Sequence, residues 1–202
     1  MIDLHYELDL WMKGMSRVAG VDEAGRGPLA GPVVAAAVVF PPSTWIEGVN
    51  DSKVLAPDSR EELFERILEH AWGIGVGIVE NTVIDRINIL QATYRAMEEA
   101  VGKIQPPPEY LLIDGRITHT FGVPFSAIVD GDARSFSIAA ASIVAKVTRD
   151  RLMENLDKLF PQYGFAQHKG YGTRQHYEAI EKFGPCEIHR RSFRPFAEAG
   201  TE

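Results

Sequence analysis

Four carboxylates stand at the ends of short apolar runs, each close to a glycine. They are Asp22, Glu23, Asp114 and Asp132. Runs of this length, rich in Val and Ile and bounded by glycine, predict buried strands. Because side chains at the ends of neighbouring buried strands are held rigidly near each other, we expect the four acids to form one cluster.

The apolar and periodic segments predict an α/β fold. Strands are expected at residues 17–21, 32–40, 72–79, 110–113 and 124–129. Helices are expected at 57–71, 88–104, 137–160 and 173–183. Thr173 is a possible N-cap of the last helix, and Gly184 lies just past its end. A tight Gly/Pro turn joins the first two strands as an antiparallel hairpin, and helices separate the later ones, so the sequence predicts a mixed five-stranded sheet flanked by helices.

Composition limits the class of protein. A chain of 202 residues that is 45% hydrophobic can bury one domain core. The single cysteine, Cys186, excludes a disulfide framework and a cysteine zinc site and fits a reducing compartment. The N-terminal segment lacks the pattern of a secretory signal, so we expect a cytoplasmic protein. The longest apolar run, 33–40, is far shorter than the roughly 20 residues of a membrane span, so no membrane contact is expected.

The net charge of -7 hides an asymmetry along the chain. Residues 133–196 hold 11 Lys/Arg and 6 Asp/Glu, whereas the remainder holds 10 and 22. A local basic face can bind a phosphate backbone although the whole molecule is acidic. The alternative is that these charges are solvated helix surface.

The four acids predict a metal site. Hard divalent ions prefer oxygen ligands, and no histidine or thiol stands beside these carboxylates, so we expect Mg²⁺ or Mn²⁺ instead of zinc. Adjacent Asp22 and Glu23 would point to opposite faces of a regular strand, so both can ligate only if the chain turns there, and Ala24-Gly25 is expected to supply that turn. Mutual repulsion should raise some of their pKa values. Any one acid alone could instead be a strand-end or loop residue.

Seven blocks of sequence together resemble ribonuclease HII. They occur in the order of that family between residues 17 and 193: Asp22-Glu-Ala-Gly-Arg-Gly-Pro-Leu-Ala-Gly-Pro32, Asp51-Ser-Lys53, Ile113-Asp-Gly115, Gly131-Asp-Ala133, the run from Ala139 to Asp150, Lys169-Gly-Tyr-Gly-Thr173 and His189-Arg-Arg-Ser-Phe193. The resemblance implies a ribonuclease H-like fold with a helical C-terminal extension. We therefore expect one domain over 1–202, with its core at about 17–160 and an extension at 161–202 that contributes to substrate binding.

The resemblance also implies an activity. It is that of a metal-dependent endoribonuclease that cuts the RNA strand of RNA/DNA hybrids and cuts at ribonucleotides embedded in duplex DNA. Two divalent ions would activate water and stabilise the leaving oxygen, leaving 3′-hydroxyl and 5′-phosphate ends. The match at Gly131-Asp132-Ala133 selects Asp132 over nearby Asp130 as the fourth ligand. A monomer is expected, and a sliding clamp is an open candidate partner.

Substrate contacts follow from the same resemblance. Gly25, Arg26 and Gly27 are expected to test for the 2′-hydroxyl, with a plain hairpin turn as the alternative. Tyr171, between two glycines, is expected to stack on the sugar that follows the last ribonucleotide, although it could instead anchor a loop. The remaining candidates, for phosphate contacts with surface charge as the alternative, are Lys53, Lys146 and Arg149.

Several residues outside this set keep open or structural roles. Either Glu23 or His189 could shuttle protons; His189 could be a general acid or structural, so it is left out of the catalytic set. Phe193–Phe196 could dock on a partner but is expected to anchor the tail to the core. Asp150 is expected to pair with Arg149 or Arg151 or to take part in the packing of the fold. The other expectations are polar surface positions for His168 and His176 and an N-terminal helix packing through Leu4, Leu8, Met12 and Met15.

Three other functions share part of this pattern. Ribonuclease HIII has the same four acids but an additional N-terminal substrate-binding domain. A non-catalytic nucleic-acid clamp could use the basic C-terminal third, but it would not need the complete carboxylate set. A resolvase or integrase of similar fold would have acidic ligands without the ribose-reading turn and tyrosine.

Overall fold

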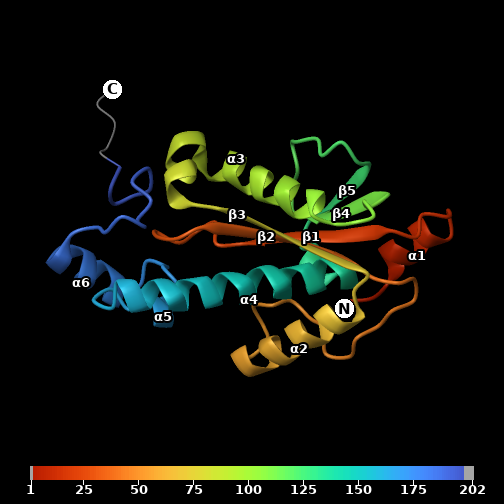
Figure 1. Cartoon of the computed structure of the whole chain (residues 1–202), viewed down its shortest axis with the longest axis horizontal. Helices are drawn as coiled ribbons and strands as arrows, with labels where there is room; N and C mark the ends of the chain where they lie inside the picture. Colours follow the sequence, from red (N-terminus) through yellow and green to blue (C-terminus); the bar gives the residue numbers. More distant parts are fainter. Residues whose placement is uncertain (1, 198–202) are drawn as a thin grey trace.

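The computed structural model describes residues 2–197 (Figure 1). Five strands form one sheet in the order β3-β2-β1-β4-β5. Their bounds are β1 Val18–Ala24, β2 Val33–Val39, β3 Gly73–Val79, β4 Tyr110–Asp114 and β5 Phe125–Ile128. The helices are α1 His5–Trp11, α2 Pro57–His70, α3 Asn81–Gly102, the 3-10 turn η1 Gly131–Ala133, α4 Phe136–Leu159, α5 Phe165–His168 and α6 Arg174–Phe183.

The sheet is mixed. β1 pairs antiparallel with β2, and β2 pairs antiparallel with β3, whereas β1–β4 and β4–β5 are parallel. The predicted hairpin and the predicted class, a mixed five-stranded sheet flanked by helices, are confirmed. Because β1, β4 and β5 run in the same direction, their C-terminal ends meet at one edge of the sheet.

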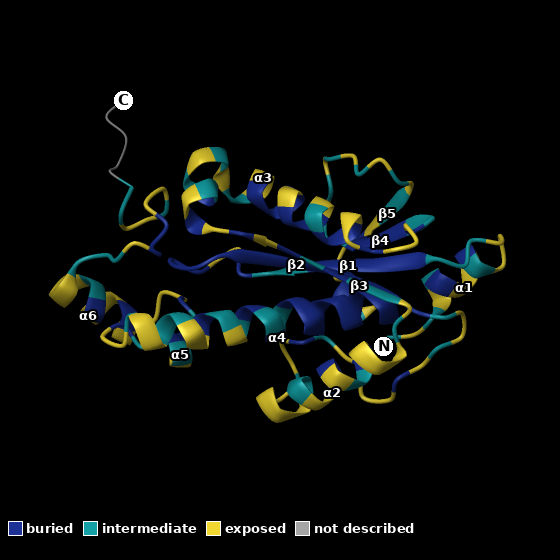
Figure 2. Ribbon diagram, in the orientation of Figure 1, coloured by how far each residue is buried: buried dark blue, intermediate teal, exposed yellow. Residues whose placement is uncertain are grey.

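Helices cover both faces of the sheet. In Figure 1, α3 lies over one face, α4 lies under the other with α2 outside it, and α5 and α6 extend from the far end of α4. One core cluster joins the sheet to α3, and a second joins it to α4 and α2. Figure 2 shows β1, β2 and the sheet-facing side of α4 as buried. The apolar run of β2 is buried throughout, as expected for a central strand covered on both faces.

Glycines let the helices approach the strands closely. A Cβ added at Gly20 of β1 would lie 2.1 Å from the backbone carbon of Ser137 in α4. On the other face, a Cβ at Gly77 would lie 1.9 Å from the carbonyl oxygen of Ala96 in α3. A side chain at either glycine would force helix and strand apart. The contact at Gly20 fixes α4 along β1 and along the turn that follows β1.

Element boundaries differ from the prediction at two informative places. β1 continues through Ala24, beyond the expected end at residue 21. α3 begins at Asn81 instead of residue 88, but Asn88 has φ 66° and interrupts the helix there. The Asn88 side chain then accepts hydrogen bonds from the amides of Leu90 and Gln91, as an N-cap does. The predicted start therefore corresponds to the second part of α3.

The two ends of the described chain are anchored differently from each other. The packing face expected for the N-terminal helix is wrong in part: Leu8 and Met12 are 44% and 77% exposed, whereas Glu7 and Leu10 are buried. The Glu7 carboxylate accepts one hydrogen bond from the hydroxyl of Ser135 and one from that of Ser137. A polar contact therefore holds α1 against the start of α4. At the other end, Phe193 packs against the α3 core, so it anchors the tail as expected.

Two further expectations concern helices. The hydroxyl of Thr173 accepts a hydrogen bond from the amide of His176, so the predicted N-cap of α6 is confirmed. In the part of the chain that the structure describes, no helix is both long and apolar enough to cross a bilayer.

Candidate functional site

The ends of β1, β4 and β5 bring the acids together. Val21 is the register partner of Ile113, so Asp22 and Asp114 follow on neighbouring parallel strands. Asp132 lies in η1, shortly after β5. The amide of Gly131 donates a 2.6 Å hydrogen bond to Asp114 Oδ1, which ties η1 to the end of β4. The expected cluster is therefore placed by strand ends and one short turn.

The acids influence one another electrostatically. Burial raises the pKa of Asp22 well above its usual value, and the charges of Glu23 and Asp114 raise it further, while the Ser142 hydroxyl opposes the shift. Burial also raises the pKa of Asp114, with the charge of Asp132 adding to it. Burial likewise raises the pKa of Glu23, against the effect of neighbouring Arg26. These mutual effects show that all four carboxylates belong to one anionic site.

Lys53 reaches into this site from the loop before α2. Its Nζ lies 2.5 Å from Asp132 Oδ2 and 3.9 Å from Asp51 Oδ1. Burial opposes the charged ammonium, but the hydrogen bond to Asp132 and its charge outweigh that effect and raise the pKa of Lys53. The side chain is still 72% exposed. Lys53 therefore combines an ion pair at the acids with access to a ligand.

The chain turns after Ala24, where Gly25 has φ +95°, as expected, but Asp22 and Glu23 still lie within a regular strand. Both residues lie within β1, opposite Ala36 and Ala35 of β2, and the chain leaves the strand only after Ala24. Side chains alternate along a strand, so Asp22 and Glu23 leave β1 in opposite directions, although the Glu23 carboxylate is still influenced by the charges of Asp114 and Lys53. Among residues 2–197, no three Asp, Glu, His or Cys side chains converge closely enough to hold an ion as they stand. The acids form an open site whose carboxylates would have to close on a bound ion.

The donor set nevertheless fits a hard divalent ion. The cluster contains only carboxylate oxygens as anionic donors, and burial together with neighbouring negative charge raises the pKa values of Asp22, Glu23 and Asp114. A divalent cation would supply positive charge and favour the deprotonated acids. Asp22, Glu23, Asp114 and Asp132 are therefore the residues that would hold Mg²⁺ or Mn²⁺.

The glycine turn after β1 lies beside Tyr171. Gly25 has φ +95°, a left-handed conformation that favours glycine. A Cβ at Gly27 would lie 3.6 Å from Tyr171 Cε1, and the amide of Leu29 donates to the carbonyl of Gly170. Arg26 Nη1 is 3.2 Å from Glu23 Oε1. The turn thus connects the acid cluster to the tyrosine, which brings together two parts of the predicted substrate site.

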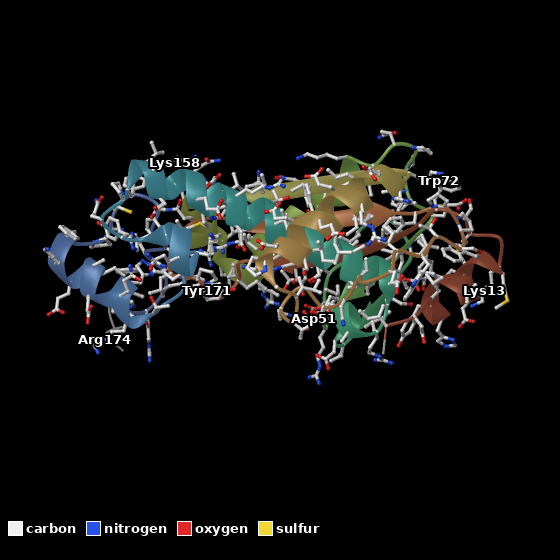
Figure 3. All side chains as sticks on the ribbon, turned by 90° about the horizontal axis from the view of Figure 1, so that it is seen from below. Lys13, Asp51, Trp72, Lys158, Tyr171 and Arg174 are labelled. Carbon is white, nitrogen blue, oxygen red and sulfur yellow. The ribbon has the colours of Figure 1, made fainter. Side chains whose placement is uncertain are left out.

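Tyr171 is accessible for stacking. Its side chain is 45% exposed. Figure 3 shows Tyr171 and Asp51, of the Asp51–Lys53 loop, on the same side of the molecule. The turn, Tyr171 and Lys53 are therefore available to one extended ligand.

Arg149 and Lys146 do not fit the expected phosphate contacts equally. Arg149 is only 1% exposed, and its guanidinium donates to the carbonyls of Pro32, Lys169 and Ala30, so the structure does not support a phosphate contact. Lys146 is partly accessible and lies 2.7 Å from Asp150 Oδ1. The expected partners of Asp150 are also wrong, because it pairs with Lys146 and with Arg60 instead of Arg149 or Arg151.

The histidines form a separate buried cluster. His176 and His189 have no exposed surface and His168 has little, so the expected surface positions of His168 and His176 are wrong. The Nε2 atoms of His176 and His189 lie 3.1 Å apart. Burial lowers the pKa of His189 to about 4, with His176 adding to the effect. His189 therefore belongs to the packing of the C-terminal extension, where it contacts His176 and Cys186.

Two residues that matter to this site were not singled out from the sequence. Ser142, on α4, acts on Asp22 and hydrogen bonds to Ser52 at 2.8 Å. Arg190 is fully buried and donates to the carbonyls of Gly25 and Arg26. Both residues lie inside the blocks that resemble the family. The sequence does not show, however, which of the adjacent Arg190 and Arg191 is buried.

Known proteins resemble this chain over nearly its whole length. The family model for Ribonuclease HII matches residues 19–195. A ribonuclease HII of Geobacter metallireducens is 59% identical over 181 residues, covering 90% of this chain and 85% of the relative. One from Acholeplasma laidlawii is 53% identical and covers 96% of both chains.

Solved structures agree with the observed fold. The ribonuclease H2 of Pyrococcus horikoshii matches with a TM-score of 0.74 and 30% identity, over 89% of this chain and 95% of that one. A Bst-RNase HIII in complex with Mn²⁺ matches with a TM-score of 0.64 at 20% identity, over 89% and 68%, which shows a shared fold alone. The ribonuclease H-like fold is thus confirmed. From the matched family and from relatives of more than half identity, the chain belongs to the ribonuclease HII family of metal-dependent endoribonucleases.

Proposed function

We propose that this enzyme hydrolyses the RNA strand of RNA/DNA hybrids and also cuts at ribonucleotides embedded in duplex DNA. The observation that carries the proposal is the continuity of the site: the Glu23–Arg26 ion pair joins the acids to the Gly25–Gly27 turn, and Gly27 lies close to the ring of Tyr171. The acids supply the reaction site, and the turn and tyrosine supply the ribose-dependent contacts.

The acids would hold two divalent ions during the reaction. When bound, such ions make water nucleophilic and stabilise the leaving oxygen. The chain itself orients Asp114 through the Gly131 amide, and it orients Asp132 through Lys53. The Asp22 carboxylate accepts a 2.7 Å hydrogen bond from the amide of Glu23, which limits its rotation. If water attacks phosphorus and the 3′-oxygen leaves, the products carry 3′-hydroxyl and 5′-phosphate ends.

Ribose recognition would come from the glycine turn. Backbone groups without side chains can lie close to a minor groove and meet a 2′-hydroxyl, the group that separates RNA from DNA. The adjacent ring of Tyr171 would stack on the sugar that follows the last ribonucleotide. Lys53 and Lys146 would contact phosphates, but the buried Arg149 is excluded from that role in the folded chain.

The proposal extends to partners and location. One solved structure that resembles this chain is that of a PCNA:RNase HII complex from Archaeoglobus fulgidus, with 27% identity and a TM-score of 0.74. A sliding clamp is therefore the first protein partner to test. We propose a cytoplasmic enzyme that acts as a monomer, and the single cysteine is in keeping with a reducing compartment.

One experiment tests substrate, metal and product together. A DNA duplex with one ribonucleotide, an RNA/DNA hybrid and an all-DNA duplex would be incubated with Mg²⁺, with Mn²⁺ or with EDTA. We expect cleavage of the first two substrates with either metal, none with EDTA, and upstream products that a polymerase extends without end repair. Cleavage of the all-DNA duplex, or products with a 2′,3′-cyclic phosphate, would contradict the proposal.

A further inference from the structure

Two buried arginines hold the glycine turn. Arg149 comes from α4 and Arg190 from the segment after α6, and they are 1% and 0% exposed. Neither forms an ion pair within residues 2–197; their seven side-chain hydrogen bonds all go to backbone carbonyls. The acceptors are Ala30, Pro32 and Lys169 for Arg149, and Gly25, Arg26, Gly31 and Pro32 for Arg190.

Burial of two guanidinium groups is unfavourable unless their nitrogen atoms are hydrogen bonded. Burial lowers the pKa of Arg149 to about 10 and that of Arg190 to about 9, so both guanidinium groups remain charged at neutral pH. The two charges also repel each other, since Arg149 lowers the pKa of Arg190. Two like charges without a direct ion pair are tolerated here because backbone carbonyl dipoles surround them, and the charges of Asp85 and Asp150 add to that effect. The planar guanidinium fork can reach several carbonyls at once, which a lysine ammonium cannot do in the same geometry.

Of the two side chains, Arg149 also touches the loop that carries Tyr171. Arg149 Nη1 donates to Lys169 O at 3.0 Å, and its guanidinium carbon lies 6.0 Å from the centre of the Tyr171 ring. A Cβ at Gly25 would lie 2.0 Å from Arg149 Nε, so the guanidinium lies directly against the turn. Arg190 adds a backbone bond from its amide to Leu29 O. Arg149 therefore bridges the turn and the tyrosine loop, and Arg190 holds the turn from the segment after α6.

We propose that Arg149 and Arg190 are positioning residues that set the place of the Gly25–Gly27 turn relative to Tyr171 and thereby determine how selectively a single ribonucleotide is recognised. This inference rests on the proposed ribose recognition by the turn and Tyr171. Neither guanidinium touches the substrate, and both act through the backbone carbonyls that they hold. A displacement of about 1 Å at such a contact can cost roughly 100-fold in rate.

The test replaces Arg190 by lysine, which keeps the charge but loses the fork. For R190K we expect catalytic efficiency on a duplex with one ribonucleotide to fall about ten- to hundred-fold, and to fall less on a long RNA/DNA hybrid, which offers many alternative positions. Thermal stabilisation by Mg²⁺ should persist, because the acids are unchanged. Hydrogen exchange should quicken at residues 25–32 and 169–172 but not in α3. The matched control is R191K, an exposed arginine next in the chain.

The outcomes separate this inference from the proposed function. An unchanged ratio between the two substrates together with unchanged exchange at the turn overturns the positioning role. Equal losses on both substrates, with loss of the Mg²⁺ effect, also overturn it, because Arg190 would then support the whole site. If R190K does not fold, R149K takes its place, and failure of both to fold would make the pair a folding requirement only. The exchange measurement needs no substrate, so it stands even if wild-type enzyme does not recognise ribose.

Discussion

Asp22 shows how a reaction site can oppose the stability of its own fold. Its side chain is almost fully buried beside two other anions, and these surroundings raise its pKa well above the usual value. A folded carboxyl with a raised pKa retains its proton where the unfolded one has lost it. The stability contributed by Asp22 is therefore lost as pH rises from about 4 through the raised value. At neutral pH and without metal, the acid cluster therefore destabilises the folded state.

The Asp22→Asn variant should reveal this opposition. We expect it to raise the melting temperature in EDTA at pH 7.5, because one member of the repelling cluster is removed while the shape is kept. Cleavage should fall by about three orders of magnitude, since an interaction of several kcal/mol with the ions is lost. Thermal melting and initial rates would check both effects. The control is Asp130→Asn, at an exposed acid outside the site, which should change neither the melting temperature nor the cleavage rate. Wild-type turnover by Asp22→Asn would remove Asp22 from the ligand set.

Tyr171 carries the second prediction at this scale. Tyr171→Ala removes the exposed ring beside Gly27 and leaves the four acids in place. A stacking loss of about 1–3 kcal/mol corresponds to a drop of roughly ten- to hundred-fold on a duplex with one ribonucleotide, with a smaller loss on a long hybrid. Initial rates under the same Mg²⁺ and salt would measure it. Tyr171→Phe keeps the ring and should retain most activity, and equal losses on both substrates would assign Tyr171 to general binding.

Sequence patterns could identify the acids but not the burial of single cations. Asp22 and Asp114 end apolar runs, so their placement follows from strand periodicity and the parallel register. The burial of Arg149 could not be predicted, because it depends on carbonyls from two segments distant in sequence, 30–32 and Lys169, which no local pattern encodes. His168 and His176 differ from the prediction for the same reason: the fold of the extension buries them together with His189.

At the scale of elements, α4 organises the site because it follows β1 closely. Ser137, Ser142 and Arg149 of α4 contact or act on Gly20, Asp22 and Gly25 in turn. Periodicity predicts both elements and their order. It cannot predict that β1 continues to Ala24, because that extension depends on pairing with Val34 of β2. The orientation of short α1 is equally hidden from periodicity, since a buried Glu7, an unusual anchor, sets it.

Gly20→Ala tests the close contact between α4 and β1. The added Cβ would lie 2.1 Å from the Ser137 backbone, which cannot move aside as a flexible side chain can. We expect a loss of about 3 kcal/mol in the free energy of unfolding, equivalent to roughly 6–12 °C in melting temperature. Gly102→Ala at the end of α3, where nothing lies within 4 Å, should be neutral or stabilising by up to about 1 kcal/mol. Equal melting temperatures for the two variants would contradict the close packing.

At the scale of the whole molecule, the basic C-terminal third presents less free charge than its composition suggested. Arg149 and Arg190 are buried, and Lys146, Arg151 and Lys169 are paired with acids. A count of charges along the sequence cannot distinguish an accessible cation from a paired one. Nucleic-acid affinity should therefore depend on fewer phosphate contacts than the excess of positive residues implies.

Salt dependence gives the measurement at this scale. Lys146→Ala should reduce the slope of log K against log salt by at most about 0.9, the value for one contact with a B-form duplex, without moving the cleavage position. Binding would be measured in EDTA over a range of salt concentrations. Lys158→Ala is the matched control, because Lys158 lies on the exposed end of α4 and bonds only to Asn155 among the described side chains (Figure 3). Equal slopes for wild type and Lys146→Ala would show that Lys146 only pairs with Asp150.

The C-terminal extension should make the whole fold sensitive to mild acid. Cys186 N donates to His189 Nδ1, and His176 Nδ1 meets the carbonyl of Tyr171, so the hydrogen bond between the two Nε2 atoms requires both rings to be neutral. Burial lowers the pKa of His189 to about 4 and also lowers that of His176, with Arg191 and His168 adding to the shift of His189.

A depressed histidine pKa fixes the sign of the pH effect. The unfolded state binds more protons between pH 6.5 and about 4, so the stability contributed by His189 is present above pH 6.5 and is lost as pH falls through that window, by at most about 3 kcal/mol. The raised pKa values of the acids act in the opposite direction, so the comparison must be made between variants. We expect the loss of unfolding free energy between pH 7.5 and 5 to be smaller in His189→Gln than in wild type, and unchanged in exposed His5→Gln. If His189→Gln loses as much stability as wild type over this range, the histidines are not the groups that take up the protons.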